Sequence, residues 1–158
     1  PGFFFWIKHC DAYADFDPGE VMRFWLNDCS DEECRAYAAP FPDESYKQGA
    51  RQFPTLVPII PDNPSIPDNK RAWKVLEKFD KPFLTAFSES PLPTRGPCAN
   101  FLDFKMYKNE APAIARFQQD IPGAHGLNHV TIADSGHYTQ DDAGEELATV
   151  AIEFFTTT

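Results

Sequence analysis

A histidine stands where an apolar run of the chain gives way to an acidic one. His137 lies between Gly136 and Tyr138 in the stretch IADSGHYTQDD, residues 132–142. The apolar residues before it are typical of a strand, and the acidic residues after it open a helix. In open parallel sheets, functional side chains gather at the carboxyl ends of the strands. We therefore treat His137 as a candidate for chemistry rather than as an ordinary surface histidine.

The elements around His137 predict an α/β fold class. Two apolar runs, KPFLTAF at 81–87 and HVTIAD at 129–134, are expected strands. A helix is expected to begin at the cap residue Asp68, and another follows His137. The first helix has an apolar face of Ala72, Val75, Leu76 and Phe79, and the last helix one of Leu147, Val150, Ala151, Phe154 and Phe155. The order helix, strand, crossover, strand and helix is typical of an α/β sheet.

The first third of the chain predicts a layer of short helices instead of a sheet. One helix is expected within 16–25, with Asp17 in its start signal. A second is expected within 30–38, because Ser30 is a natural N-cap and acidic residues follow it in the first turn. A third short helix is expected through 46–52.

Proline and the loss of periodicity mark the irregular parts. The proline-rich stretch 54–68 predicts a shaped loop. An irregular insertion is expected at about 97–115, where no clear period is present. We therefore expect residues 1–67 to form a helical cap region and residues 68–158 to form part of a core domain.

The charge balance excludes some classes of partner. The 158 residues carry 24 acidic and 14 basic side chains, for a net charge of -10. A nucleic acid or an anionic membrane surface would require a basic face, so neither is an expected partner. No apolar run approaches the roughly 18 residues of a membrane span. The 42% of hydrophobic residues suffice for the core of one domain.

The cysteines and the first residues add expectations about compartment and length. The chain has four cysteines, Cys10, Cys29, Cys34 and Cys98. They lack metal-binding spacing, so we expect no metal, with reduced thiols in a cytoplasmic protein. The chain starts within an apolar stretch and without methionine. We therefore expect it to be part of a longer protein.

Three stretches together resemble one enzyme family. They are WLNDCSDEECRAYAAPFPDESYKQGARQFPTLVP at 25–58, KPFLTAFSES at 81–90, and IPGAHGLNHVTIADSGHYTQDDAGEELA at 121–148. They resemble the second half of a haloalkane dehalogenase of the α/β-hydrolase superfamily. The pattern AAPFPDESYKxGxRxFP within the first stretch is specific to that family. The resemblance implies a partial α/β-hydrolase fold, made of its C-terminal strands and helices, with a helical cap.

The resemblance also implies an activity and site residues. Such enzymes cleave the carbon–halogen bond of haloalkanes through an aspartyl ester, giving an alcohol and a halide, with water as co-substrate and no cofactor. By resemblance, His137 is the base that activates water, and Trp6 is an N–H donor to the departing halide. The resemblance further implies a substrate cavity with an apolar lining: Phe3, Phe53, Pro54 and Val57.

The sequence departs from the family pattern at two points. No G-x-D-x-G or G-x-S-x-G elbow occurs, so the nucleophile would lie upstream and this chain alone is expected to be inactive. Pro91 stands where the third carboxylate of the triad is expected. Glu89 and Asp103 are the alternative acids.

Two other interpretations stay open. A related capped hydrolase such as an epoxide hydrolase would use cap tyrosines, for which Tyr13 and Tyr46 are candidates. A non-catalytic remnant or binding protein that keeps the cap fold would also explain Pro91 and the missing elbow. A separate expectation concerns assembly: half of a sheet exposes an edge and an apolar face that the missing strands would have covered, so we expect self-association through it.

Overall fold

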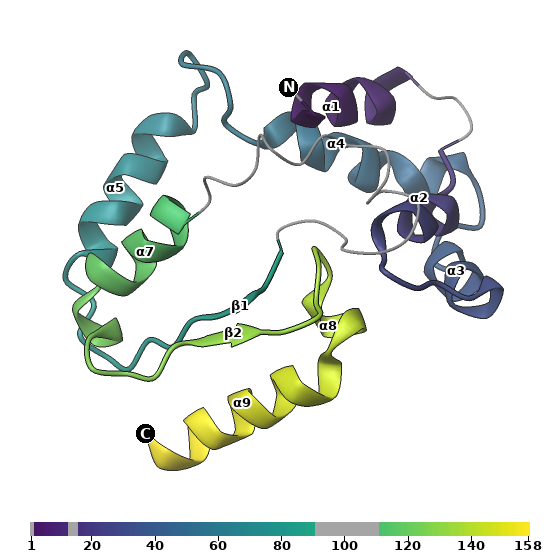
Figure 1. The fold of residues 1–158 in the computed structure, drawn as a ribbon. Coiled ribbons are helices and arrows are strands. Elements are labelled where there is room, and N and C mark those ends of the chain that lie inside the picture. The colour runs from purple at the N-terminus through teal and green to yellow at the C-terminus, as the bar shows by residue number, and fades with distance from the viewer. Residues whose placement is uncertain (1, 13–15, 91–110) are drawn as a thin grey trace.

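The computed structural model describes residues 2–12, 16–90 and 111–158, apart from the side chains of Phe3, Phe5 and residues 111–113. Figure 1 shows two strands in the middle of the molecule, with helices grouped near both ends of the strands and the last helix running below them. Helices thus combine with a parallel two-stranded sheet, in agreement with the expected α/β composition.

The first part of the chain folds into short helices, as predicted. They are α1 (Gly2–Ala12), α2 (Pro18–Trp25), α3 (Asp31–Ala38), the 3-10 turn η1 (Glu44–Lys47) and α4 (Gln48–Leu56). α1 packs against α4, and α2 packs against α3. The Asp17 carboxylate accepts a hydrogen bond from the Gly19 amide at 2.8 Å and starts α2. Ser30 and Glu33 form a capping box at the start of α3, so both predicted caps are confirmed.

The second part supplies the sheet and the helices around it. Its elements are α5 (Ile66–Leu76), β1 (Ala86–Ser88), α7 (Ala111–Gln119), η3 (Pro122–Ala124), β2 (Val130–Ile132), α8 (Thr139–Asp142) and α9 (Gly144–Thr157). β1 and β2 are parallel, with Phe87 opposite Thr131. The Thr85 amide donates to His129 Nδ1 at 3.1 Å, which joins the starts of the two strands. His129 is therefore a strand-start residue with a structural contact.

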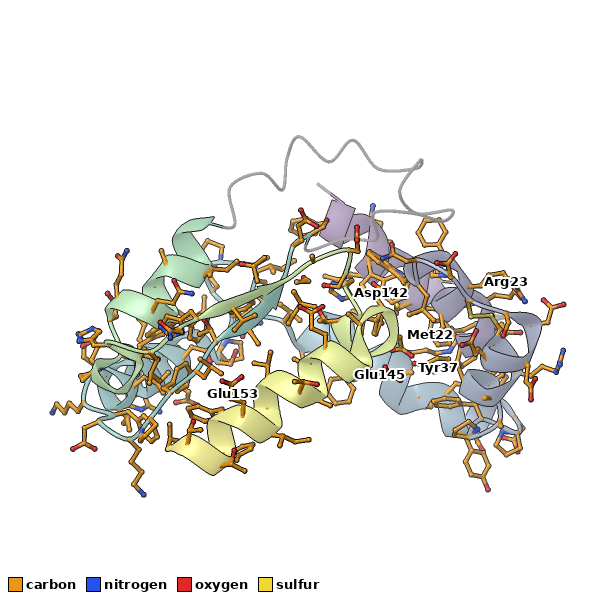
Figure 2. The ribbon with its side chains drawn as sticks, turned by 60° about the horizontal axis from the view of Figure 1, so that its bottom comes forward. Met22, Arg23, Tyr37, Asp142, Glu145 and Glu153 are labelled. Carbon is orange, nitrogen blue, oxygen red and sulfur yellow. A yellow bond between two sulfur atoms is a disulfide. The ribbon has the colours of Figure 1, made fainter. Side chains whose placement is uncertain are left out.

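The start of α9 and the preceding α8 lie beside the first helices. The Tyr37 hydroxyl of α3 donates to the Asp141 carboxylate of α8 at 2.6 Å. Figure 2 shows Asp142 and Glu145 at this end of α9 near Met22 and Tyr37, while Glu153 lies farther along the helix. The helical layer therefore contacts the segment that follows β2.

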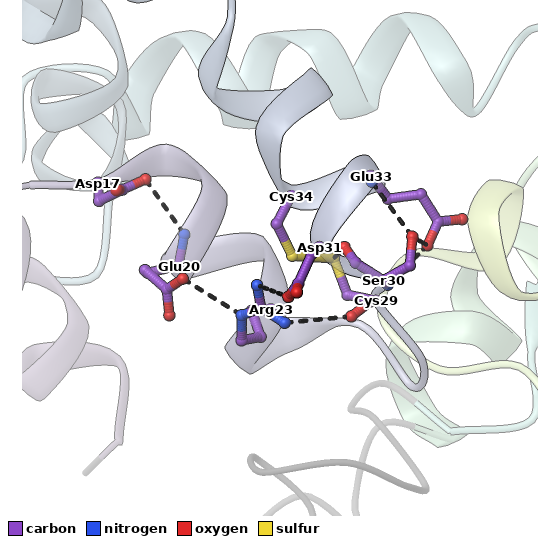
Figure 3. A network of polar contacts seen from close by, with 8 residues as sticks. All are labelled: Asp17, Glu20, Arg23, Cys29, Ser30, Asp31, Glu33 and Cys34. Carbon is purple, nitrogen blue, oxygen red and sulfur yellow. Dashed lines mark hydrogen bonds and ion pairs between the residues drawn. A yellow bond between two sulfur atoms is a disulfide. The ribbon is translucent and has the colours of Figure 1, made fainter.

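A polar network joins α2 to α3 and to the loop between them, and a disulfide joins that loop to α3 (Figure 3). Arg23 donates to Asp31 at 2.8 Å, to Glu20 at 3.2 Å and to the Cys29 carbonyl at 3.4 Å. Cys29 and Cys34 form a disulfide across the turn, so the expectation of reduced thiols is wrong for this pair. The physical reason is the tight turn before α3, which brings their Cα atoms to 6.3 Å, within the range a disulfide spans.

The described residues bury a small set of side chains and leave many apolar ones exposed. Ile121, just before η3, and Ile132 of β2 are fully buried, and so is Cys10 of α1. The last helix, in contrast, exposes 65% of Ile152 and 79% of Phe155. The apolar stripe predicted for this helix is thus only partly covered within the described residues.

Several element boundaries differ from the prediction. α5 begins at Ile66 with Ser65 as its N-cap residue, so Asp68 is not the cap. Pro67 explains the difference, because proline suits the first turn of a helix, where its missing N–H is not needed. α4 continues through Pro54 to Leu56, because the proline affects only its last turn. The strands are shorter than the apolar runs that predicted them.

The expected insertion lies mostly outside the described residues, which omit 91–110. Its last part belongs to α7, which is a helix through Gln119.

Candidate active site

The loop that carries His137 follows β2 and is bonded to both strands. The Ser135 side chain is fully buried and donates to the Ile132 carbonyl at 2.9 Å. The amide of Ser90, beyond β1, donates to the Ser135 carbonyl at 3.3 Å. Asp134 has a φ of 51°, a left-handed conformation that aspartate tolerates better than most residues. His137 therefore lies at the carboxyl ends of the strands.

The His137 imidazole is exposed and lies against aromatic rings. Its centroid is 5.4 Å from the Trp25 ring, at an interplanar angle of 42°. It is also 5.0 Å from the Tyr138 ring, which it meets edge to face. Because Trp25 ends α2, the helical layer reaches the histidine loop directly.

Trp6 also contacts Trp25. The two indoles meet edge to face, with their centroids 5.9 Å apart and an interplanar angle of 77°. Trp6 also stacks on His9, at 5.6 Å between centroids. The structure thus brings Trp6 and His137 to the same ring, from α1 and from the loop after β2.

Trp6, Trp25 and His137 form an aromatic cluster. Of these three residues, Trp25 is the one that the sequence alone did not identify as functional. The sequence contained one signal for it, a bulky aromatic residue at the last position of an amphipathic helix. That signal does not reveal a partner as distant in the chain as His137, because only tertiary packing creates the contact.

Glu89 lies one residue beyond β1, at the same edge of the sheet as His137. Its amide donates to the Ile132 carbonyl at 2.9 Å and extends the parallel pairing. Its carboxylate accepts a hydrogen bond from the Asp134 amide at 3.1 Å. Pro91 and Asp103 lie outside the described residues.

The residues expected to line a substrate cavity lie on two helices. Phe3 belongs to α1, but its side chain is outside the described part of the structure. Pro54 is buried within α4. Phe53 and Val57, at the end of the same helix, expose 72% and 41% of their surface. Two of these apolar side chains are thus presented at the surface of the described chain.

A hollow of about 340 Å³ lies between α1 and α4. Its lining is mostly polar: Cys10, Asp11, Glu44, Gln48, Arg51, Gln52 and Thr55. Arg51 crosses it, donating to the Cys10 carbonyl at 3.2 Å and to Glu44 at 2.9 Å. This hollow differs in character from the apolar cavity that the resemblance implies.

Acidic side chains affect the phenols near His137. Burial, and then the hydrogen bond to Asp141, raise the pKa of Tyr37 to about 12. Burial, followed by the charge of Asp141, also raises the pKa of Tyr138. Both phenols are therefore neutral donors at physiological pH.

Two classes of site were sought in the part of the chain that the structure describes. There, no group of three or more His, Cys, Asp or Glu side chains is placed to hold a metal ion. In the same residues, no helix combines the length and the apolar character that crossing a membrane requires.

Sequence comparisons place these features among known proteins. No family model matches the chain. A haloalkane dehalogenase of Psychrobacter cryohalolentis is 39% identical over 154 residues, which is 97% of this chain and 46% of that protein. Haloalkane dehalogenase 1 of Mycobacterium tuberculosis is 43% identical over 142 residues, 87% of this chain and 42% of that protein. A haloalkane dehalogenase of Mycobacterium marinum is 43% identical over 112 residues, 71% of this chain and 32% of that protein.

The similarity covers most of the chain, although the chain spans less than half the length of the relatives it matches. It includes the segments that carry Trp6, Trp25 and His137 in the longest of these alignments, which covers 97% of the chain. The chain is therefore similar to proteins named haloalkane dehalogenase over nearly all of its residues.

Proposed function

We propose that this chain forms the cap and the C-terminal part of the catalytic domain of a haloalkane dehalogenase-like hydrolase with an α/β-hydrolase fold. The whole enzyme would convert a small halogenated alkane and water into an alcohol and a halide. The observation that carries the proposal is the aromatic cluster in which Trp25 contacts both Trp6 and His137. The relatives named haloalkane dehalogenase support the reaction class.

The first step of the proposed reaction needs a nucleophile and a halide donor. An aspartate carboxylate, supplied by residues outside these 158, attacks the carbon that bears the halogen. The new carbon–oxygen bond forms as the carbon–halogen bond breaks, and the halogen leaves with the electron pair as halide. The Trp6 indole N–H suits the developing anion, because it is a donor without a competing acceptor.

The second step assigns a role to His137. Its imidazole takes a proton from water as the water oxygen attacks the ester carbonyl. Collapse of the adduct breaks the bond to the alkoxide, which takes this proton and leaves as the alcohol, and the aspartic acid that remains loses its proton to solvent. The exposed imidazole at the carboxyl edge of the sheet has the access to water that this step requires.

Glu89 is the proposed acid that orients His137. It lies at the correct edge of the sheet, and its carboxylate is already tied to the loop that carries the histidine, through the Asp134 amide. Phe3, Phe53, Pro54 and Val57 are the proposed lining of the substrate cavity. An alkyl halide offers little to hydrogen-bond, so an apolar wall suits it.

Other parts of the proposal concern assembly and compartment. We propose self-association of the chain through the edges of the two-stranded sheet that the described residues form and through the exposed apolar side chains of α9. We also propose the cytoplasmic location that was expected from the sequence.

Halide release tests the proposed function. The chain would be assayed with 1,2-dibromoethane and a pH indicator, both alone and joined to the N-terminal half of the Psychrobacter cryohalolentis relative. We expect release from the joined protein alone, because this chain has no nucleophile elbow. A folded joined protein without release would overturn the proposal and favour a non-catalytic binding protein.

The halide role of Trp6 has its own matched variants. In the joined protein, Trp6→Phe should lower kcat by about a hundredfold, the usual loss for one preorganised donor. Trp73→Phe is the control, since Trp73 lies on α5 and stacks instead with the Arg116 guanidinium at 3.7 Å. Equal activity of both variants would remove the halide role from Trp6.

A further inference from the structure

One carboxylate oxygen connects the helical layer to the loop that carries His137. Asp142 Oδ2 accepts a hydrogen bond from the Gly136 amide at 2.7 Å. The same oxygen accepts a second hydrogen bond from the Asn27 side-chain amide at 2.8 Å. Asn27 is only 3% exposed, so this contact is made away from bulk water.

The two donors flank the imidazole and its aromatic neighbour. Gly136 immediately precedes His137, and Asn27 lies two residues beyond Trp25. The oxygen of Asp142 therefore links the backbone next to His137 to a side chain close in sequence to Trp25, and the centroids of the Trp25 and His137 rings are 5.4 Å apart.

A neighbouring contact holds the same two segments together. Tyr37 of α3 donates to Asp141 at 2.6 Å, beside the Asn27–Asp142 contact. Figure 2 shows Tyr37 and Asp142 on facing sides of the junction between the helical layer and the start of α9. Two successive acidic residues of α8 thus bind two different parts of the helical layer.

We propose that Asp142 is a positioning residue for His137, acting by tying the Gly136 amide of the histidine loop to Asn27 of the helical layer. It touches no reacting atom. It keeps the imidazole against Trp25, and thereby at a fixed place relative to Trp6. This role rests on the proposed function of His137 as the base, while the geometry itself can be tested without any reaction.

The shared oxygen decides which substitutions are informative. An asparagine at position 142 keeps one carbonyl oxygen, which can accept both hydrogen bonds, so Asp142→Asn should preserve the arrangement. Asp142→Ala removes both bonds. Asn27→Ala removes the hydrogen bond to Asp142 and leaves the bond between Asp142 and Gly136. Glu146→Gln is the control, because it removes a negative charge from an exposed position close in sequence.

The test is the contact between the Trp25 and His137 rings in this chain, observed by nuclear magnetic resonance. The wild-type chain should show cross-relaxation between indole and imidazole protons and a ring-current shift of the His137 signals. Asp142→Ala and Asn27→Ala should lose the cross-peak and the shift, whereas Asp142→Asn and Glu146→Gln should keep both. If the Asp142→Ala chain does not fold, the Asn27→Ala chain decides. A retained ring contact in the folded variants that lack the Asn27–Asp142 bond would overturn the proposal.

Activity of the joined protein separates this proposal from the proposed function. Asp142→Ala should lower kcat by about a hundredfold through displacement of the base, and Asp142→Asn should restore it. An inactive wild-type joined protein in which the ring contact still depends on Asp142 would overturn the proposed function and leave the structural coupling standing. An active joined protein that is indifferent to both Asp142→Ala and Asn27→Ala would overturn the positioning role alone.

Discussion

Gly19 lies where α2 packs tightly on α3, so we expect a larger residue at this position to lower the stability of the chain. A Cβ atom at Gly19 would collide with the carbonyl oxygen of Cys34 and would lie 3.1 Å from its carbonyl carbon. The obstacle is backbone, so it cannot rotate away as a side chain would. Gly19→Ala must therefore separate the two helices.

The magnitude follows from two opposing effects. Overpacking typically costs about 1 to 3 kcal/mol, and we expect the upper end because the obstacle is rigid. The higher helix propensity of alanine returns about 1 kcal/mol. The net loss in the free energy of unfolding is about 2 kcal/mol. With a urea m-value of about 2 kcal/mol per molar, the midpoint should fall by about 1 M.

Gly49→Ala provides a matched control with the opposite sign. Gly49 lies in α4, and a Cβ atom there would meet nothing within 4 Å. The same substitution should therefore stabilise the chain by about 0.5 to 1 kcal/mol. Both variants would be unfolded in urea and followed by helical circular dichroism. A Gly19→Ala chain as stable as the wild type would refute the close packing of α2 on α3.

Three further outcomes follow from burial and hydrogen bonding. Burial raises the pKa of Cys10 from 9.0 to about 11, so the fraction of its thiol that is ionised at about pH 8 should fall about a hundredfold. Cys10 should therefore resist alkylation by iodoacetamide in the folded chain and react in urea. Rapid labelling of the folded chain would contradict its burial. Burial and Asp141 raise the pKa of Tyr37 from 10.0 to about 12, so the stability that the Tyr37–Asp141 contact contributes is complete below pH 10 and is lost as the pH rises through about 12. In a titration followed by tyrosinate absorbance, Tyr37→Phe should remove the part of the absorbance change that occurs near pH 12. An unchanged titration would argue against the contact. Ile132 is fully buried, so Ile132→Ala should lower the free energy of unfolding by about 2 to 5 kcal/mol. Ile152 is 65% exposed, so Ile152→Ala should lower it by about 0.5 kcal/mol or less. Similar urea midpoints for the two variants would place Ile132 outside the core.

Local signals in the sequence predicted the local features of the fold well. Asp17 and Ser30 start α2 and α3 as expected, because a cap depends on residues within one turn of it. The start of α5 was placed wrongly at Asp68, because Ser65 and Pro67 offered a competing start three residues earlier.

Contacts between residues far apart in the sequence were harder to predict from the sequence. The resemblance pointed to Trp6 and His137 separately, and both remain predictions as site residues. Their common neighbour Trp25 emerges only when α2 is packed against the histidine loop. The bond between Asn27 and Asp142 is similarly non-local, since neither residue type nor spacing specifies its partner.

The central claim is that His137 is the base of a dehalogenase-like reaction. Its most direct test is the number of halide ions that each molecule of the joined protein releases when it carries His137→Ala. The first step does not need the base and the second does, so this variant should release about one equivalent of halide per molecule and then stop, while the wild type continues. His125→Ala, which changes an exposed histidine bonded to the Gln119 carbonyl, should turn over normally. Sustained turnover by the His137→Ala protein at the wild-type rate would contradict the role of His137.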